Sequence, residues 1–242
     1  MTEVEQAGRV AQVRAALEAV TDPEIDESVV ALEFISALAV SPAGEVAIEF
    51  RLPTYWCAPN FAFLMASDMR EAVAALSWVQ AVTVRLVDHF SAELINRGVA
   101  REQSFRAAFP GESDDDLAVV RQKFLGKAFE RRQELLVRHL LGQGQRPEGL
   151  TALSLRGLRA LPLGAEGERL RALYAYAWRR LWPAWGEERL AFVTLGGAGL
   201  EPAGLRGHLR KLAGVRRNAE FNGGICRSLL AERKADLAAS NP

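Results

Sequence analysis

The segment Leu52-Pro53-Thr54-Tyr55-Trp56-Cys57-Ala58-Pro59 marks the point where an extended stretch of chain gives way to a helix. Pro59 suits the first helical position, because that position needs no backbone N–H donor. Cys57 therefore stands just before a helix start, where free backbone N–H groups and the positive end of the helix dipole favour a thiolate. A thiolate can ligate iron or zinc and can act as a nucleophile. Cys57 is the leading functional candidate, and burial as a small apolar side chain is the alternative.

The patterns on both sides of this loop predict a small α+β module. Apolar residues at three- and four-residue spacing indicate amphipathic helices. Runs of β-branched residues and alternation of apolar and polar residues indicate strands, and Ser41-Pro42-Ala43-Gly44 is a turn signal that predicts a hairpin. The expected order is helix, strand, strand, helix, strand, helix, over residues 5–20, 29–40, 46–50, 59–76, 79–87 and 91–98.

Beyond Gly98 the pattern is helical. Ser113 followed by three aspartates is a strong helix start, because a hydroxyl cap and acidic side chains suit the positive end of a helix. Further helices are expected, separated by a linker at 142–147 and a leucine-rich stretch at 150–161; they cover about 113–141, 167–182, 202–213 and 223–237. The predicted fold class is therefore α+β: a small helix–hairpin–helix–strand module followed by a mainly α-helical carboxy-terminal region. The expected domains are 1–100, a connecting helix at 101–144, and a helical domain at 145–242.

Composition excludes several classes of protein. Thirty basic and thirty acidic side chains cancel, so no net field attracts nucleic acid or an anionic membrane. The basic stretch from Arg206 to Arg217 lacks an aromatic platform, which favours a solvated helix face or a docking surface for an acidic protein. The sequence contains no run of about 18 consecutive apolar residues, so a membrane-spanning helix is not expected. The two cysteines, without a secretory signal, favour free thiols and a cytoplasmic protein. From the charge balance and the lack of a spanning segment, we expect it to bind neither nucleic acid nor membrane.

The second cysteine, Cys226, follows Asn222-Gly223-Gly224, which predicts a turn, so Cys226 is also expected near a helix start. Two interpretations stay open: a two-thiolate site that joins Cys226 to Cys57, or burial within a carboxy-terminal helix. Of the three histidines, none has metal-ligand spacing, and His89 at the end of a strand is expected on the solvated surface.

Asp22 and Glu24 flank a proline at the junction between the first helix and the hairpin. Carboxylates at such positions commonly cap turns, which is one interpretation of both. The other is that they approach Cys57 and oppose the influence of the helix start on its thiol.

Three features together resemble the SufT/PaaD-type metal–sulfur cluster assembly family over residues 10–98: Asp22-Pro23-Glu24-Ile25 before a hairpin, Leu52-Pro53-Thr54 leading to Cys57, and Asp88 after the last strand. The resemblance implies that Cys57 handles an iron–sulfur cluster or docks onto its recipient, with Asp22, Glu24 and Thr54 nearby. Two differences concern the loop. The family usually has threonine four residues before the cysteine and proline directly after it, whereas here Thr54 is three before and Ala58 intervenes.

The leading hypothesis is a cytoplasmic, non-catalytic maturation factor for iron–sulfur enzymes, whose partners are a client metalloprotein and cluster-assembly proteins. Cys57, with Cys226 as a second cofactor-binding candidate, would hold only a transient iron–sulfur cluster, because a stable cluster usually takes four protein ligands. The helical extension would supply a client-specific surface or a homodimer contact. The PaaD-like relatives imply service to a metabolic enzyme such as a multicomponent oxygenase.

Two alternatives come from other classes of protein. In the first, Cys57 is the nucleophile of a thiol-dependent enzyme, which would need a nearby base. In the second, the chain is a metal-free, chaperone-like adaptor for a metabolic enzyme, and the cysteine only packs.

Overall fold

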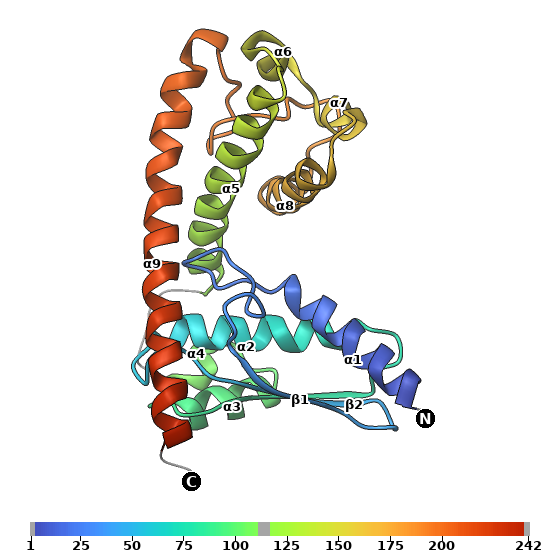
Figure 1. Cartoon of the computed structure of the whole chain (residues 1–242), viewed down its shortest axis with the longest axis vertical. Helices are drawn as coiled ribbons and strands as arrows, with labels where there is room; N and C mark the ends of the chain where they lie inside the picture. The colour runs from blue at the N-terminus through green and yellow to red at the C-terminus, as the bar shows by residue number, and fades with distance from the viewer. Residues whose placement is uncertain (1–2, 111–116, 240–242) are drawn as a thin grey trace. The chain divides into compact units, whose positions relative to one another are not determined.

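The structure, a computed structural model, describes residues 3–110 and 117–239 (Figure 1). The predicted helix start at Ser113 lies outside these residues. The predicted α+β class, with a helical carboxy-terminal region, is confirmed. The elements are α1 (Glu3–Glu18), β1 (Ile35–Val40), β2 (Glu45–Phe50), α2 (Pro59–Ala74), β3 (Ala81–Leu86), α3 (Ala92–Ala100), α4 (Phe105–Ala108), α5 (Leu117–Gly142), α6 (Pro147–Ala152), α7 (Leu155–Ala160), α8 (Ala165–Leu181), the 3-10 helix η1 (Pro202–Gly204) and α9 (Leu205–Ala239).

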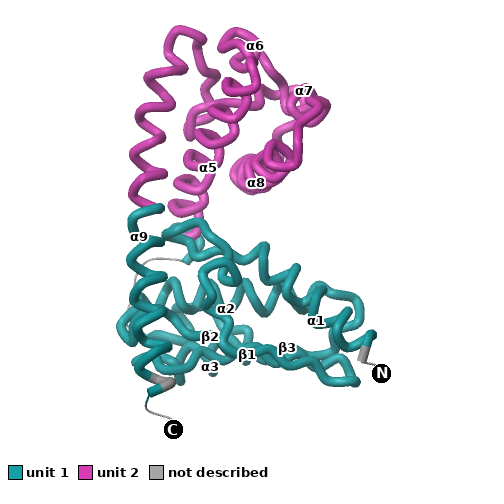
Figure 2. Tube along the Cα trace, in the orientation of Figure 1, with its two compact units in different colours: residues 1–120, 220–242 teal, residues 121–219 magenta. Residues whose placement is uncertain are grey.

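The chain divides into two compact units (Figure 2). Unit 1 comprises residues 1–120 and 220–242, and unit 2 comprises residues 121–219. Helix α9 contributes to both, because its first part belongs to unit 2 and its last part to unit 1. The amino-terminal module is therefore packed with a helix that comes from the other end of the chain.

Unit 1 is built on a three-stranded sheet in the order β1-β2-β3. The β1–β2 pair is the predicted antiparallel hairpin, and β2 pairs with β3 in parallel, with Phe50 opposite Leu86. A parallel pair needs a crossover connection, which α2 supplies. Val46, Ile48 and Phe50 alternate with more exposed residues along β2 and are buried. Figure 1 shows α1 and α2 on the same side of the sheet.

The expected strand over residues 29–34 is wrong, because this stretch forms turns. The amide of Val29 bonds to the carbonyl of Val20, and the amide of Phe34 bonds to the carbonyl of Val29. Glu33 has a φ of 58°, a left-handed conformation that a strand cannot contain. The strand-forming side chains are apolar because they enter the core: Val29 and Phe34 are buried. Burial therefore explains the composition that suggested a strand.

The expected turn at Asn222-Gly223-Gly224 is also wrong, because α9 runs through it without a break. Cys226 therefore lies within a helix and not near a helix start. Glycine disfavours helices by about 1 kcal/mol relative to alanine, so a tertiary contact has to compensate. At Gly223 a Cβ atom would lie 3.0 Å from Cγ2 of Ile25 and 3.4 Å from Oε1 of Glu27. The missing side chain lets α9 approach the turn that contains Ile25.

Unit 2 packs α5, α6, α7, α8 and the first part of α9 around a core that includes Phe129, Tyr174 and Trp178. A buried polar network crosses this core. The Gln133 amide donates to Tyr174 Oη at 3.1 Å and to the Val193 carbonyl at 2.8 Å. Since both protons of the amide nitrogen are used, its oxygen accepts from His208 Nε2 at 2.8 Å. The side chains of Gln133, Tyr174 and His208 therefore find polar partners inside the protein.

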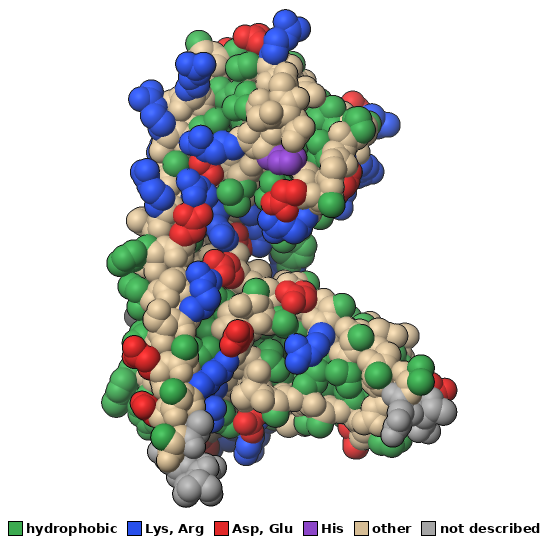
Figure 3. All heavy atoms as spheres, viewed as in Figure 1, with side chains coloured by type: hydrophobic (Ala, Val, Ile, Leu, Met, Phe, Trp, Pro, Cys, Tyr) green, Lys and Arg blue, Asp and Glu red, His purple; other side chains and the backbone are tan. Residues whose placement is uncertain are grey.

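On the face of the molecule that Figure 3 shows, Lys and Arg side chains predominate over unit 2. The equal totals of acidic and basic residues in the sequence therefore do not mean an even distribution of charge over the two units. Among residues 3–110 and 117–239, no helix has the length and apolar character needed to cross a membrane.

Candidate functional site

The site lies where the two parallel strands end. The loop after β2 contains residues 51–58 and the loop after β3 contains residues 87–91. Backbone bonds hold the loop after β3 against this edge: the Val87 amide donates to the carbonyl of Phe50 at the end of β2 at 3.0 Å, and the Phe90 amide to the carbonyl of Tyr55 in the loop after β2 at 3.2 Å. Ligand sites of sheets with parallel strands commonly lie at this carboxyl edge.

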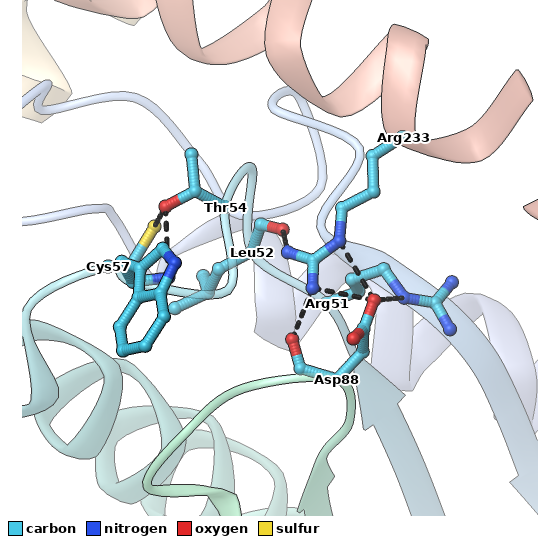
Figure 4. Close-up of polar contacts among 7 residues, drawn as sticks. Arg51, Leu52, Thr54, Cys57, Asp88 and Arg233 are labelled. Carbon is cyan, nitrogen blue, oxygen red and sulfur yellow. Dashed lines mark hydrogen bonds and ion pairs between the residues drawn. The ribbon is translucent and has the colours of Figure 1, made fainter. Parts of the chain in front are cut away.

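Cys57 is half-buried and lies two residues before the start of α2. Its Sγ atom is 3.3 Å from Oγ1 of Thr54, which also accepts a hydrogen bond from the Trp56 amide at 3.3 Å. Figure 4 shows the Thr54 and Cys57 side chains turned toward one another. The predicted pair is thus in contact, although Thr54 is one residue closer in sequence than the family pattern has it. Ala58, the residue before α2, provides no side-chain cap.

His89 forms a hydrogen bond to the backbone of Cys57. Its Nε2 atom is 2.8 Å from the carbonyl oxygen of Cys57, and the Ser91 amide donates to its Nδ1 at 3.1 Å. Because Nδ1 is an acceptor, the ring proton is on Nε2 and is donated to Cys57. Burial lowers the pKa of His89, and the positive charge of Arg233 lowers it further, whereas the bond to Cys57 raises it. The expectation that His89 is solvated is wrong: only 5% of it is exposed.

Asp22 forms the turn that precedes the hairpin. Its Oδ1 atom accepts hydrogen bonds from the amides of Glu24 at 2.8 Å and Ile25 at 2.9 Å. The side chain is buried, and burial raises its pKa to about 6 despite these two bonds. Glu24 is exposed, and its Oε1 atom is 3.4 Å from Nδ2 of Asn222 on α9. Both carboxylates therefore have structural partners in unit 1.

Cys226 lies on α9 and is half-buried against the core of unit 1. Its pKa is raised to about 11, mainly by burial and then by electrostatic interactions with Asp22, Cys57 and Glu24 that disfavour its thiolate. Such interactions require these groups to lie close to Cys226. The structure thus brings together four residues that the sequence singled out, from three separate parts of the chain. At neutral pH Cys226 is a protonated thiol.

Arg233, two turns further along α9, has no counterpart among the residues predicted from the sequence. Its Nη1 atom donates to the Leu52 carbonyl at 2.9 Å, and its Nε atom to Asp88 Oδ2 at 2.8 Å. It also donates to the Asp88 carbonyl. Arg51 is the second cation at Asp88, with Nε 3.7 Å from Oδ2 (Figure 4). The partners of Arg233 are more than 140 residues away in sequence, so no local pattern indicates them.

Three aromatic side chains are exposed beside the thiol. Trp56 is 73% exposed, Phe90 43% and Tyr55 42%. The Trp56 ring centroid lies 4.9 Å from that of Tyr55 and 5.3 Å from that of Phe90. We call these three residues the aromatic cluster. Exposed groups of large apolar side chains commonly mark interaction sites.

The available donors limit what the thiol can hold. Among the residues that the structure describes, no group of three or more His, Cys, Asp and Glu side chains is arranged to bind a metal ion. Cys57 and Cys226 together supply at most two sulfur ligands. An iron–sulfur cluster bound here as cargo would complete its coordination with ligands from elsewhere, such as another protein chain.

The fold and this geometry define a small α+β domain that presents a thiol at the carboxyl edge of a parallel strand pair. Residues 10–85 of the domain match the family model described as "Iron-sulfur cluster assembly protein". The resemblance drawn from the Asp22 turn and Cys57 is thereby confirmed for the amino-terminal domain. The matched residues are less than half of the chain and end before His89 and α9. No curated protein and no solved structure matched the chain.

Proposed function

We propose that this protein acts in the assembly of iron–sulfur centres by handling a cluster as transient cargo at Cys57. The observation that carries the proposal is the position of Cys57: a half-buried sulfur in contact with Thr54, at the carboxyl edge of a domain matched to the iron–sulfur cluster assembly family. The recipient would be a client metalloprotein that supplies the remaining ligands. Cys226 is the second candidate ligand, since it lies within electrostatic reach of Cys57.

Binding of iron at this site would change the state of Cys226. Sulfur ligates metals as thiolate, and Cys226 is protonated at neutral pH because its pKa is about 11. A positively charged iron centre offsets the surrounding negative charge, so ligation by Cys226 would release a proton. Cys57 is the primary attachment point in this scheme, and Cys226 joins only when iron is present.

Anaerobic reconstitution with iron and sulfide tests the proposal. We expect wild type to show sulfur-to-iron charge-transfer absorption and to retain iron after gel filtration, and Cys57→Ser to lose both. Cys226→Ser should retain a part of the iron. Unchanged iron content and absorption in Cys57→Ser, or none in wild type, would refute the carrier function. An anaerobic pull-down with wild type and Cys57→Ser then shows whether co-purifying proteins depend on the thiol.

The aromatic cluster supports a second candidate function, that of a metal-free adaptor that docks a client enzyme. Trp56, Tyr55 and Phe90 are exposed next to Cys57, as a docking surface requires. A Trp56→Ala variant separates the two functions. If the protein is an adaptor, the client's activity falls in Trp56→Ala and is unchanged in Cys57→Ser. If it is a carrier, Cys57→Ser abolishes client maturation.

A further inference from the structure

The last part of α9 contacts both the loop that contains Cys57 and the loop after β3 that bonds to it. Unit 1 contains two polypeptide segments, and the carboxy-terminal one begins at residue 220. Its Leu230 side chain is buried in the core of unit 1. Side chains of this segment that bond to the amino-terminal segment include Asn222 to Glu24, Arg227 to Glu27, Arg233 to Leu52 and Asp88, and Lys234 to Glu33. Of these, only Arg233 bonds to the loops around the thiol.

The contacts of Arg233 differ from those of Arg227 in number and in burial. The Arg233 side chain is 14% exposed, whereas that of Arg227 is 47% exposed and pairs with the Glu27 carboxylate. The planar guanidinium of Arg233 donates at once to the Leu52 carbonyl, the Asp88 carboxylate and the Asp88 carbonyl. Such a fork fixes orientation as well as distance. Figure 4 shows the guanidinium between these groups.

Each partner of Arg233 is linked to Cys57 through one further residue that contacts it, Thr54 or His89. Leu52 is buried and begins the segment that leads through Thr54 to the thiol. Asp88 immediately precedes His89, whose ring donates to the Cys57 carbonyl. Asp88 has a φ of 55°, in the left-handed region that non-glycine residues seldom adopt. A bond to its carbonyl and another to its carboxylate hold this conformation.

We infer that Arg233 is a positioning residue for Cys57, which ties the loops after β2 and β3 together so that the thiol is presented in one arrangement. The site is then completed by a helix outside the matched family domain. The role of this arrangement in cluster handling rests on the function proposed above, but the positioning itself can be measured without iron.

The test compares three full-length variants in a Cys226→Ser background, where Cys57 is the only cysteine. Arg233→Gln removes the fork, Arg233→Lys keeps the charge but lacks the planar fork, and Arg227→Gln is the matched control on the same helix. Hydrogen exchange is followed in peptides that cover residues 51–58 and 87–91. Alkylation of Cys57 by iodoacetamide is timed at one fixed pH. Circular dichroism checks the fold of each variant.

We expect Arg233→Gln to speed exchange in both loops by at least about tenfold, since the loss of even one charge-assisted hydrogen bond has about that effect, and to change the alkylation rate of Cys57. Arg233→Lys should show nearly the same changes in exchange and alkylation as Arg233→Gln. Arg227→Gln should leave exchange in both loops as it is in the Cys226→Ser parent. Equal effects of Arg233→Gln and Arg227→Gln, or wild-type behaviour of Arg233→Lys, would overturn the inference. If Arg233→Gln unfolds, Arg233→Lys and Asp88→Asn still decide it through the same two readouts.

Iron reconstitution of these variants separates the two proposals. If wild type binds iron, Arg233→Gln should alter the visible circular dichroism of the sulfur-to-iron bands, because that signal reports ligand geometry. If wild type binds no iron, the carrier function fails, while hydrogen exchange and alkylation still decide whether Arg233 positions Cys57.

Discussion

The imidazole of His89 donates its Nε2 proton to the carbonyl oxygen of Cys57 over 2.8 Å. This bond joins the loop after β3 to the residue that carries the thiol, and the Ser91 amide fixes the tautomer that makes it possible. The histidine therefore acts on the backbone of Cys57. Both of its ring nitrogens are engaged with backbone groups, so its position does not support a nucleophile–base pair of the kind a thiol enzyme uses.

Replacing His89 should loosen Cys57 and destabilise unit 1. In His89→Ala, the Cys57 carbonyl and the Ser91 amide both lose their partner, and Ser91 is buried. An unpaired buried polar group costs about 1–3 kcal/mol. Hydrogen exchange in peptides of α2 and β3 should accelerate accordingly. His139→Ala, in unit 2, is the control and should leave these peptides unchanged; equal acceleration in the two variants would contradict the role of His89.

Asp22 should make the stability of unit 1 depend on pH. Its pKa is about 6 in the folded protein and 3.8 without burial. The unfolded chain therefore loses this proton first, so the contribution of Asp22 is greatest below pH 3.8 and is lost as the pH rises through 6. The substitution Asp22→Asn would keep an oxygen acceptor for the two turn amides without acquiring a charge. We expect the stability of this variant relative to wild type to rise by about 3 kcal/mol from below pH 3.8 to about pH 7.5.

The measurement for Asp22 is the free energy of unfolding at about pH 4 and about pH 7.5, on either side of the folded-state pKa, obtained from denaturant titrations monitored in unit 1. Only the change in the difference between wild type and Asp22→Asn is used, because the amide also alters packing at both pH values. A difference that stays constant across this range would show that Asp22 is not held in a desolvated position.

Local patterns predicted the elements that depend on neighbouring residues. Pro59 indicates the start of α2, and alternation along β2 indicates its buried side, because both effects act within a few residues. The same patterns placed Cys57 at a helix start. Where the prediction failed, a distant contact decided the structure: residues 29–34 are apolar because they enter the core, and α9 continues through Gly223 because Ile25 packs against it.

In the candidate site, too, the features that depend on neighbouring residues were predictable and those that depend on distant contacts were not. The proximity of Thr54 to Cys57 follows from three residues of separation, and the resemblance placed Asp22 nearby. The pair Asp88-His89 directly after a strand was the one local signal for the burial of His89. No local signal in the sequence indicated the role of Arg233, because α9 meets the partners of this residue only by packing against a domain from the other end of the chain.

The two adjacent glycines of α9 offer a test of this packing. Gly224 has nothing within 4 Å of the place where a Cβ would be, so Gly224→Ala should stabilise the protein by about 1 kcal/mol through helix propensity. At Gly223 the added methyl would meet Ile25 Cγ2 at 3.0 Å, and the gain should be lost to crowding. Denaturant unfolding should therefore rank Gly224→Ala above Gly223→Ala. The opposite order, or equal destabilisation by both, would indicate a turn at this point.

The buried network of unit 2 predicts a difference between two tyrosines of α8. Tyr174 is fully buried; its hydroxyl donates to the Ala191 carbonyl at 2.6 Å and accepts from Gln133. Tyr176 is 48% exposed. Tyr174→Phe leaves the Ala191 carbonyl and one Gln133 proton without a partner in the core, and should cost about 1–3 kcal/mol. Tyr176→Phe should change stability by less than about 0.5 kcal/mol, as surface substitutions usually do.

The two tyrosine variants are compared by hydrogen exchange in peptides of α5 and α8, which report on unit 2. Both substitutions remove one hydroxyl from the same helix, so a loss of helix propensity cannot account for a difference between them. Because Gln133 also bonds to Val193 and His208, Tyr174→Phe should accelerate exchange around residues 191–193 as well as on α8. An effect confined to α8 would mean that the hydroxyl packs without connecting the helix to that segment.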